Sequence, residues 1–108
     1  MLIEHDKLTA ISTSILEAAG APVERARLVS EHLVEANLKG HDSHGVGMVS
    51  NYVRHMLAGL VDVNRDAELI NDAGAVLSCD GGAGFGRVVG MHAMAAGIVR
   101  AREHGVCV

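Results

Sequence analysis

The residues of this sequence that are best suited to chemistry lie together in one short stretch, residues 40–46. His41, Asp42, Ser43 and His44 place two imidazoles, a carboxylate and a hydroxyl at consecutive positions, with a glycine on either side. Imidazole changes charge near neutral pH, so a histidine beside such groups can donate, accept or relay a proton. The flanking glycines permit a tight backbone. We interpret the stretch as a polar loop between two helices that turns at least one side chain toward a pocket.

The segments on either side of this loop are expected to be helices that position it. Apolar residues recur at spacings of three and four after Asp6, a suitable N-cap, and stop at Gly20, which predicts a first amphipathic helix. A second such pattern runs from Pro22 to Gly40, and a third helix follows the loop and reaches Leu60. The residues expected to be buried along the first helix are Leu8, Ile11, Ile15, Leu16 and Ala19.

The character of the sequence changes near Asp62. Residues 68–70 and 75–79 predict two short strands joined as a hairpin. A glycine-rich loop at 80–86 then leads into a long helix, from about Val88 to Glu103. Several positions of this helix are glycine or alanine, so part of its surface is nearly bare of side chains.

The last residues, 105–108, are typical of the opening of a buried strand. We therefore interpret the chain as a truncated portion of something longer. Taken together, the elements predict an α+β fold that is not a Rossmann fold. We expect a helical N-terminal segment at 1–61, which carries the polar loop, and the start of an α/β portion at 62–108.

Length and composition exclude several classes of function. With 108 residues, the chain is one small domain by length. Its formal net charge is −4 and it has no run of basic residues that could bind a phosphate backbone, which argues against nucleic acid as a partner. No apolar run approaches the roughly 20 residues of a membrane helix. Cys79 and Cys107 are isolated cysteines in a chain without a signal segment, so we expect free thiols in the cytoplasm.

The glycine-rich loop has the context of a dinucleotide-binding fingerprint but not its spacing. It reads G-x-G-x-x-x-G from Gly84, or G-x-G-x-G from Gly82, instead of G-x-G-x-x-G. The strand before it also reads as part of a hairpin. A role in turning and close packing is therefore favoured over a role in holding phosphate.

Three other interpretations of the sequence stay open at this point. In the first, the polar loop is a solvated turn in which Asp42 or Ser43 caps the next helix. In the second, His41, Asp42 and His44 are the metal ligands of a metal-dependent hydrolase. The second of these is weakened because an H-x-x-H loop lacks the i, i+4 spacing that puts two imidazoles on one helix face. Finally, the bare helix at 88–103 is compatible with a small protein-interaction module.

At the polar loop the chain also resembles a known family. The resemblance is carried by residues 41–48, which read HDSHGVGM, and by the segments 52–54, 58–60 and 101–106. Over essentially its whole length the chain is similar to the N-terminal region of the type 2 malate/L-lactate dehydrogenase family. The resemblance implies a dimeric enzyme that uses NAD or NADP and transfers a hydride between the nicotinamide and a 2-hydroxy or 2-oxo acid.

The resemblance also implies roles for the residues of the loop. His44 aligns with the proton donor of the family, which a ketone oxygen needs once hydride has added to its carbon. Ser43 is expected to add a hydrogen bond to that oxygen, and Asp42 to orient the loop or the imidazole.

Two departures from the family pattern limit what is carried over. Many members have Arg-x-Pro after the signature, whereas this chain has Met48 and Ser50, and a methionine cannot pair with a substrate carboxylate. A methionine here is typical of the branch that resembles hydroxycarboxylate dehydrogenase B, which suggests a bulkier, less polar 2-oxo acid, and Arg54 is a candidate carboxylate partner. The cofactor-binding segments of the family lie beyond residue 108, so no cofactor-binding residue is assigned and the isolated chain is expected to be inactive.

Overall fold

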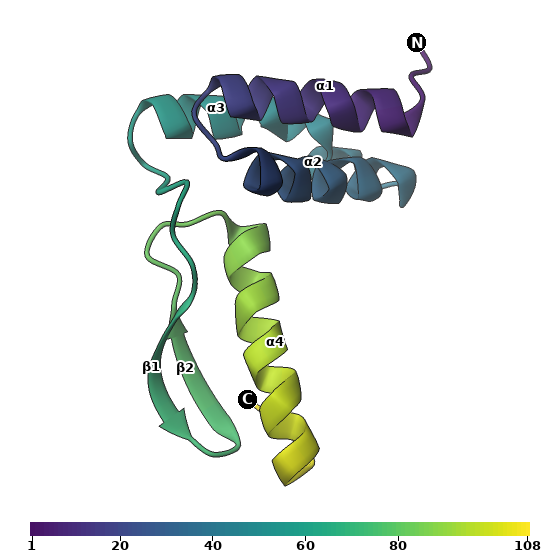
Figure 1. The fold of residues 1–108 in the computed structure, drawn as a ribbon. Helices are drawn as coiled ribbons and strands as arrows, with labels where there is room; N and C mark the ends of the chain where they lie inside the picture. The colour runs from purple at the N-terminus through teal and green to yellow at the C-terminus, as the bar shows by residue number, and fades with distance from the viewer. The chain divides into compact units, whose positions relative to one another are not determined.

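The computed structural model describes residues 1–108, which form two compact units, Met1–Asn64 and Arg65–Val108. The first unit is helical, and the second contains a two-stranded antiparallel sheet and one long helix (Figure 1). The predicted α+β class with a non-Rossmann arrangement is therefore confirmed. None of the helices is both long enough and apolar enough to cross a membrane.

The first unit is built from three α-helices and two short 3-10 turns. Helices α1 (His5–Ala18) and α2 (Val23–Leu38) lie side by side and run in opposite directions, as Figure 1 shows. The 3-10 turns η1 (Asp42–His44) and η2 (Val46–Met48) follow, and they lead directly into α3 (Val49–Leu57). The predicted polar loop is therefore two consecutive turns between α2 and α3.

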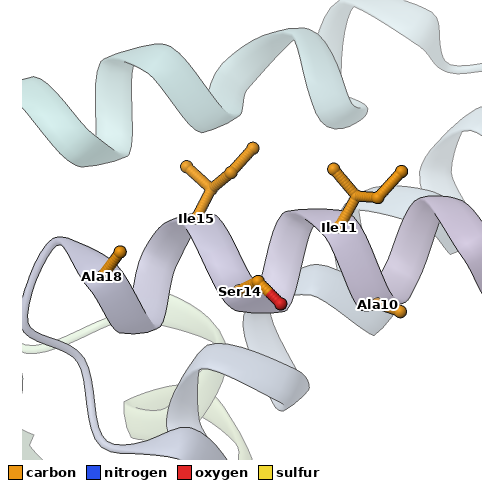
Figure 2. Close-up of a pocket in the computed structure, with 5 residues that line it drawn as sticks. All are labelled: Ala10, Ile11, Ser14, Ile15 and Ala18. Atoms are coloured by element: carbon orange, nitrogen blue, oxygen red, sulfur yellow. The ribbon is translucent and has the colours of Figure 1, made fainter.

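The core of the first unit includes only part of the apolar stripe that the sequence predicts for α1. Leu16 is fully buried, but Ile11 and Ile15 are 52% and 43% exposed. Figure 2 shows both isoleucines projecting from one side of α1, where they border a shallow hollow of about 410 Å³. The residue buried one turn before Leu16 is Ser12, so the covered face of α1 is displaced from the predicted one. The other buried apolar residues of this unit are Ala21, Ala26, Val29, Leu33, Val34, Val49 and Met56.

Two predictions of helix capping are wrong. The N-cap of α1 is Glu4, in extended backbone, and Asp6 lies inside the first turn, where its charge favours the helix N-terminus without a capping hydrogen bond. Likewise, α3 begins after Met48, so neither Asp42 nor Ser43 caps it. Helix α1 begins earlier than the sequence predicts, and the open alternative in which Asp42 or Ser43 caps the next helix fails because α3 begins later than it requires.

The second unit consists of a β-hairpin with a helix alongside it. Strands β1 (Glu68–Ala73) and β2 (Val76–Asp80) pair in antiparallel register, with an irregularity between Leu69 and Asn71. Helix α4 (Gly86–His104) runs along the hairpin in Figure 1.

An ion pair joins α4 to the hairpin. The Arg100 guanidinium donates to the carboxylate of Asp72, whose other oxygen accepts the Gly74 N–H at 3.2 Å. The hydrogen bond that Arg100 donates to Asp72 raises the pKa of Arg100 above its usual range. Asp72 thus holds both the tight turn of the hairpin and the last turns of α4.

The C-terminal residue lies beside β2 in parallel orientation. The Val108 N–H donates to the Ala75 carbonyl and the Val108 carbonyl accepts the Leu77 N–H, both at 2.8 Å, which is the pattern of a parallel bridge to Val76. The side chain of Val108 is 80% exposed, so the expected strand is present only as this bridge and is not buried.

The nearly bare side of α4 faces this part of the unit. Gly90, Ala93 and Gly97 line a cavity of about 310 Å³ together with Leu77 of β2 and Cys107. Within the unit, the small residues of α4 are therefore opposite β2 and the C-terminal segment.

Candidate active site

The polar loop begins where glycine ends α2. Gly40 has a φ of +82°, a backbone conformation that residues with a side chain rarely adopt, and its N–H donates to the Asn37 carbonyl at 3.0 Å. The His41 N–H donates to the Ala36 carbonyl at 2.8 Å. These bonds use the last free carbonyls of α2 and direct the chain into the turn that carries His44.

The side chain of Asn37 holds both ends of the turn. Its Nδ2 donates to Asp42 Oδ1 at 2.6 Å, and its Oδ1 accepts the backbone N–H of Val46 at 2.8 Å. Gly45 is buried against the same amide, and a Cβ on Gly45 would collide with it. Asp42 therefore orients the loop by way of Asn37.

Ser43 is the side chain that contacts the imidazole of His44. The distance between Ser43 Oγ and His44 Nδ1 is 3.0 Å. The hydroxyl can accept from a protonated Nδ1 or donate to an unprotonated one. Either arrangement engages Nδ1 and leaves Nε2 as the nitrogen that can exchange a proton with a ligand.

A groove of about 420 Å³ lies beside His44. Its walls are one face of α2 and the start of the loop, and its lining residues are His32, Glu35, Ala36, Lys39, His41 and His44. Lys39 Nζ pairs with Glu35 Oε1 at 2.5 Å along this face. The groove thus combines three imidazoles with an ammonium and a carboxylate.

The sequence analysis did not single out the residues that α2 contributes to the groove. His32, Glu35 and Lys39 are spaced i, i+3 and i+7, which places them on one helical face that leads to the loop. That spacing was the available signal. Asn37 carries no comparable pattern, because its role depends on a turn that only the folded backbone defines.

The two residues predicted to bind substrate do not line this groove. Met48 is half-buried at the end of η2, where its sulfur accepts from Asn51 Nδ2 at 3.7 Å. Arg54 is exposed on α3. The structure therefore brings His41 and His44 together at one groove and leaves Met48 and Arg54 outside its lining.

Neither a metal site nor a phosphate cradle is formed by these residues. No group of three His, Cys, Asp or Glu side chains is placed to hold a metal ion, so the hydrolase interpretation finds no ligand set in residues 1–108. In the glycine-rich loop, the space beside Gly82 and Gly84 is filled by Arg65, and Val89 also lies against Gly84. This loop serves close packing within its own unit, as its spacing indicates.

Comparison with known proteins identifies the family of the chain. The model of the malate/L-lactate dehydrogenase family matches residues 3–108. Hydroxycarboxylate dehydrogenase B of Escherichia coli K12 is 42% identical over 93 residues, which are 86% of this chain and 26% of that protein. L-sulfolactate dehydrogenase of Methanocaldococcus jannaschii is 31% identical over 106 residues, 98% of this chain and 31% of that protein.

A solved structure gives the same result for the fold. A malate/lactate dehydrogenase structure from E. coli superposes with a TM-score of 0.93 at 37% identity, over 99% of this chain and 30% of that one. The chain thus spans between a quarter and a third of the length of the proteins that it matches. It belongs to the malate/L-lactate dehydrogenase family.

Proposed function

We propose that this chain supplies the proton-transfer site of an oxidoreductase that interconverts 2-hydroxy and 2-oxo acids with NAD or NADP. The observation that carries the proposal is the placement of His44. Its imidazole lies at the groove of about 420 Å³, and Ser43 engages Nδ1 at 3.0 Å. A histidine that lines a groove and has one ring nitrogen hydrogen-bonded can act as a general acid and base through its other nitrogen.

The proposed chemistry follows from the needs of a carbonyl group. When a hydride adds to the carbonyl carbon of a 2-oxo acid, negative charge develops on the oxygen. The imidazolium of His44 donates its Nε2 proton to that oxygen, and its Nδ1–H remains hydrogen-bonded to Ser43 Oγ. In the direction of oxidation, neutral Nε2 takes the hydroxyl proton.

The substrate class is proposed from the charge of the groove and from the names of the relatives. Malate, lactate and sulfolactate share a 2-hydroxy carboxylate and differ in the remaining side chain. Lys39, which also pairs with Glu35, contributes an ammonium group beside His44 that can attract a substrate carboxylate. Arg54 remains our candidate for pairing with the carboxylate, and Met48 for contact with an apolar substrate side chain.

The cofactor and the assembly are proposed on the resemblance alone. NAD or NADP would supply or accept the hydride. No residue of this chain is assigned to it, since the glycine-rich loop is filled by Arg65. We further propose a homodimer as the active form. The 108-residue chain alone should reduce no 2-oxo acid with either nucleotide.

A chimera tests the proposed function directly. Residues 1–108 would replace the matching N-terminal segment of E. coli hydroxycarboxylate dehydrogenase B, and 2-oxo acid reduction would be followed by nucleotide absorbance. We expect an active chimera in which His44→Gln lowers kcat by at least about 100-fold, the lower end of the contribution of a general acid. His55→Gln is the matched control, because His55 is exposed on α3 and does not line the groove.

The opposite result would remove the basis of the proposal. If the His44→Gln chimera kept the kcat of its parent, His44 would not be the proton donor. An inactive but folded parent chimera, judged by its circular dichroism and melting temperature, would also count against the proposed function.

A further inference from the structure

We infer that Asn37 is the residue that positions His44 for proton transfer. This inference rests on the proposed function, because it concerns the same imidazole. Asn37 does not line the groove. It is half-buried on α2, and its side chain reaches the loop on both sides of His44.

The first step is the geometry of the two hydrogen bonds. Asp42, two residues before His44, accepts from Asn37 Nδ2 at 2.6 Å. Val46, two residues after His44, donates its N–H to Asn37 Oδ1 at 2.8 Å. One amide thus ties the side chain of Asp42 and the backbone of Val46, on either side of the histidine, to a helix.

The second step is the short path between these fixed points and the imidazole. Within the turn, the His44 N–H donates to the His41 carbonyl at 2.9 Å, and the Gly45 N–H donates to the Asp42 carbonyl at 3.1 Å. Few backbone torsions remain free between Asp42 and Val46. The direction in which His44 leaves the backbone is therefore set by these turn bonds together with the two Asn37 bonds.

The third step is that the site requires an amide. Asp42 offers only acceptors when ionised, and Val46 offers only a backbone donor, so the residue between them must both donate and accept. An aspartate at position 37 could accept from Val46 but would place a second negative charge against Asp42. A leucine or alanine would satisfy neither group.

Exchange of the two side chains isolates this interaction. Asn37→Asp should break the bond to Asp42, and adding Asp42→Asn should restore an amide–carboxylate bond with donor and acceptor reversed. The Val46 N–H keeps an acceptor in both variants. Restoration in the double variant would show that the pair itself holds the loop.

Hydrogen exchange of the Val46 amide in the 108-residue chain is the first measurement. Asn37→Ala should speed exchange about tenfold, the factor that corresponds to one lost hydrogen bond. Asn37→Asp keeps the acceptor for Val46 but sets two carboxylates against each other, so it should also speed exchange by loosening the loop, and the double variant should reverse most of that change. Asn64→Ala, at an exposed asparagine outside the helices, is the matched control. Unchanged exchange in Asn37→Ala would overturn the inference.

Epistasis in the chimera is the second measurement, and a merely structural role would not produce it. Asn37→Ala should lower kcat about tenfold with little change in KM, because it misdirects the proton donor. In the His44→Gln background the same substitution should cause no further loss. An equal loss in both backgrounds would overturn the positioning role. If His44→Gln has no effect while the Val46 exchange responds as expected, the proposed function fails and the clamp on the loop stands.

Discussion

At the scale of single residues, Asp42 and Ser43 of the polar loop have different partners. Asp42 binds Asn37 and so belongs to the support of the loop, whereas Ser43 contacts the imidazole of His44. From the sequence alone, Asp42 could have oriented either the loop or the imidazole, because both lie within reach along the chain. The structure separates these possibilities by showing which atoms meet.

Gly45 provides a prediction at this scale. Its φ of −91° suits any residue, so the constraint is the amide of Asn37, with which a Cβ would collide. Gly45→Ala should displace that amide, break its two hydrogen bonds and lower the free energy of unfolding by about 2 kcal/mol, measured by urea denaturation. Gly47→Ala is the matched control, because nothing lies within 4 Å of a Cβ there.

A double-variant cycle identifies the cause of that loss. In the Asn37→Ala background the collision is relieved, so Gly45→Ala should cost much less than in the parent. An equal cost in both backgrounds would show that the asparagine amide is not the obstacle.

At the scale of elements, the order of helices and strands was predictable, and the face that each helix buries was not. Apolar residues at spacings of three and four indicate a helix, regardless of which neighbouring element packs against it. Ile15 and Leu16 are neighbours on that helix, about 100° apart, and either could have been buried. Contact with α2 and α3 decides in favour of Leu16. The lining of the groove was unpredictable for the same reason. His32 and Lys39 of α2 belong to the groove only because the loop lies beside that face of the helix.

Ser30 provides a prediction at the scale of a helix and its packing. Its side chain on α2 is fully buried, and its Oγ has no hydrogen-bond partner. Burying an unpaired hydroxyl costs free energy, so Ser30→Ala should raise the free energy of unfolding by about 1 kcal/mol. Ser14→Ala, in the exposed part of α1, measures the gain in helix propensity alone. If the free energy of unfolding rises no more for Ser30→Ala than for Ser14→Ala, the buried hydroxyl of Ser30 does not destabilise the fold.

At the scale of the whole chain, apolar burial is concentrated in the first unit. Eight of the ten buried apolar residues lie within Met1–Asn64, and only Phe85 and Val88 lie in Arg65–Val108. Exposed apolar side chains of the second unit occur on both the hairpin and α4, including Leu69, Ile70, Met91, Met94, Ile98 and Val99. Since burial of apolar surface is the main stabilising contribution, the two units should differ in their ability to fold alone.

The last prediction follows from that difference. Residues 1–64 expressed alone should show helical circular dichroism and a cooperative thermal transition, whereas residues 65–108 alone should show neither a cooperative transition nor dispersed amide resonances. Leu16→Ala in the 1–64 segment removes a fully buried side chain and should cost about 2–5 kcal/mol, enough to abolish the transition of so small a unit. Ile15→Ala, next to it but 43% exposed, should leave the transition in place. A cooperative transition in residues 65–108 alone would contradict this, because it would show that a hairpin, one helix and two buried apolar side chains are enough for an independent fold.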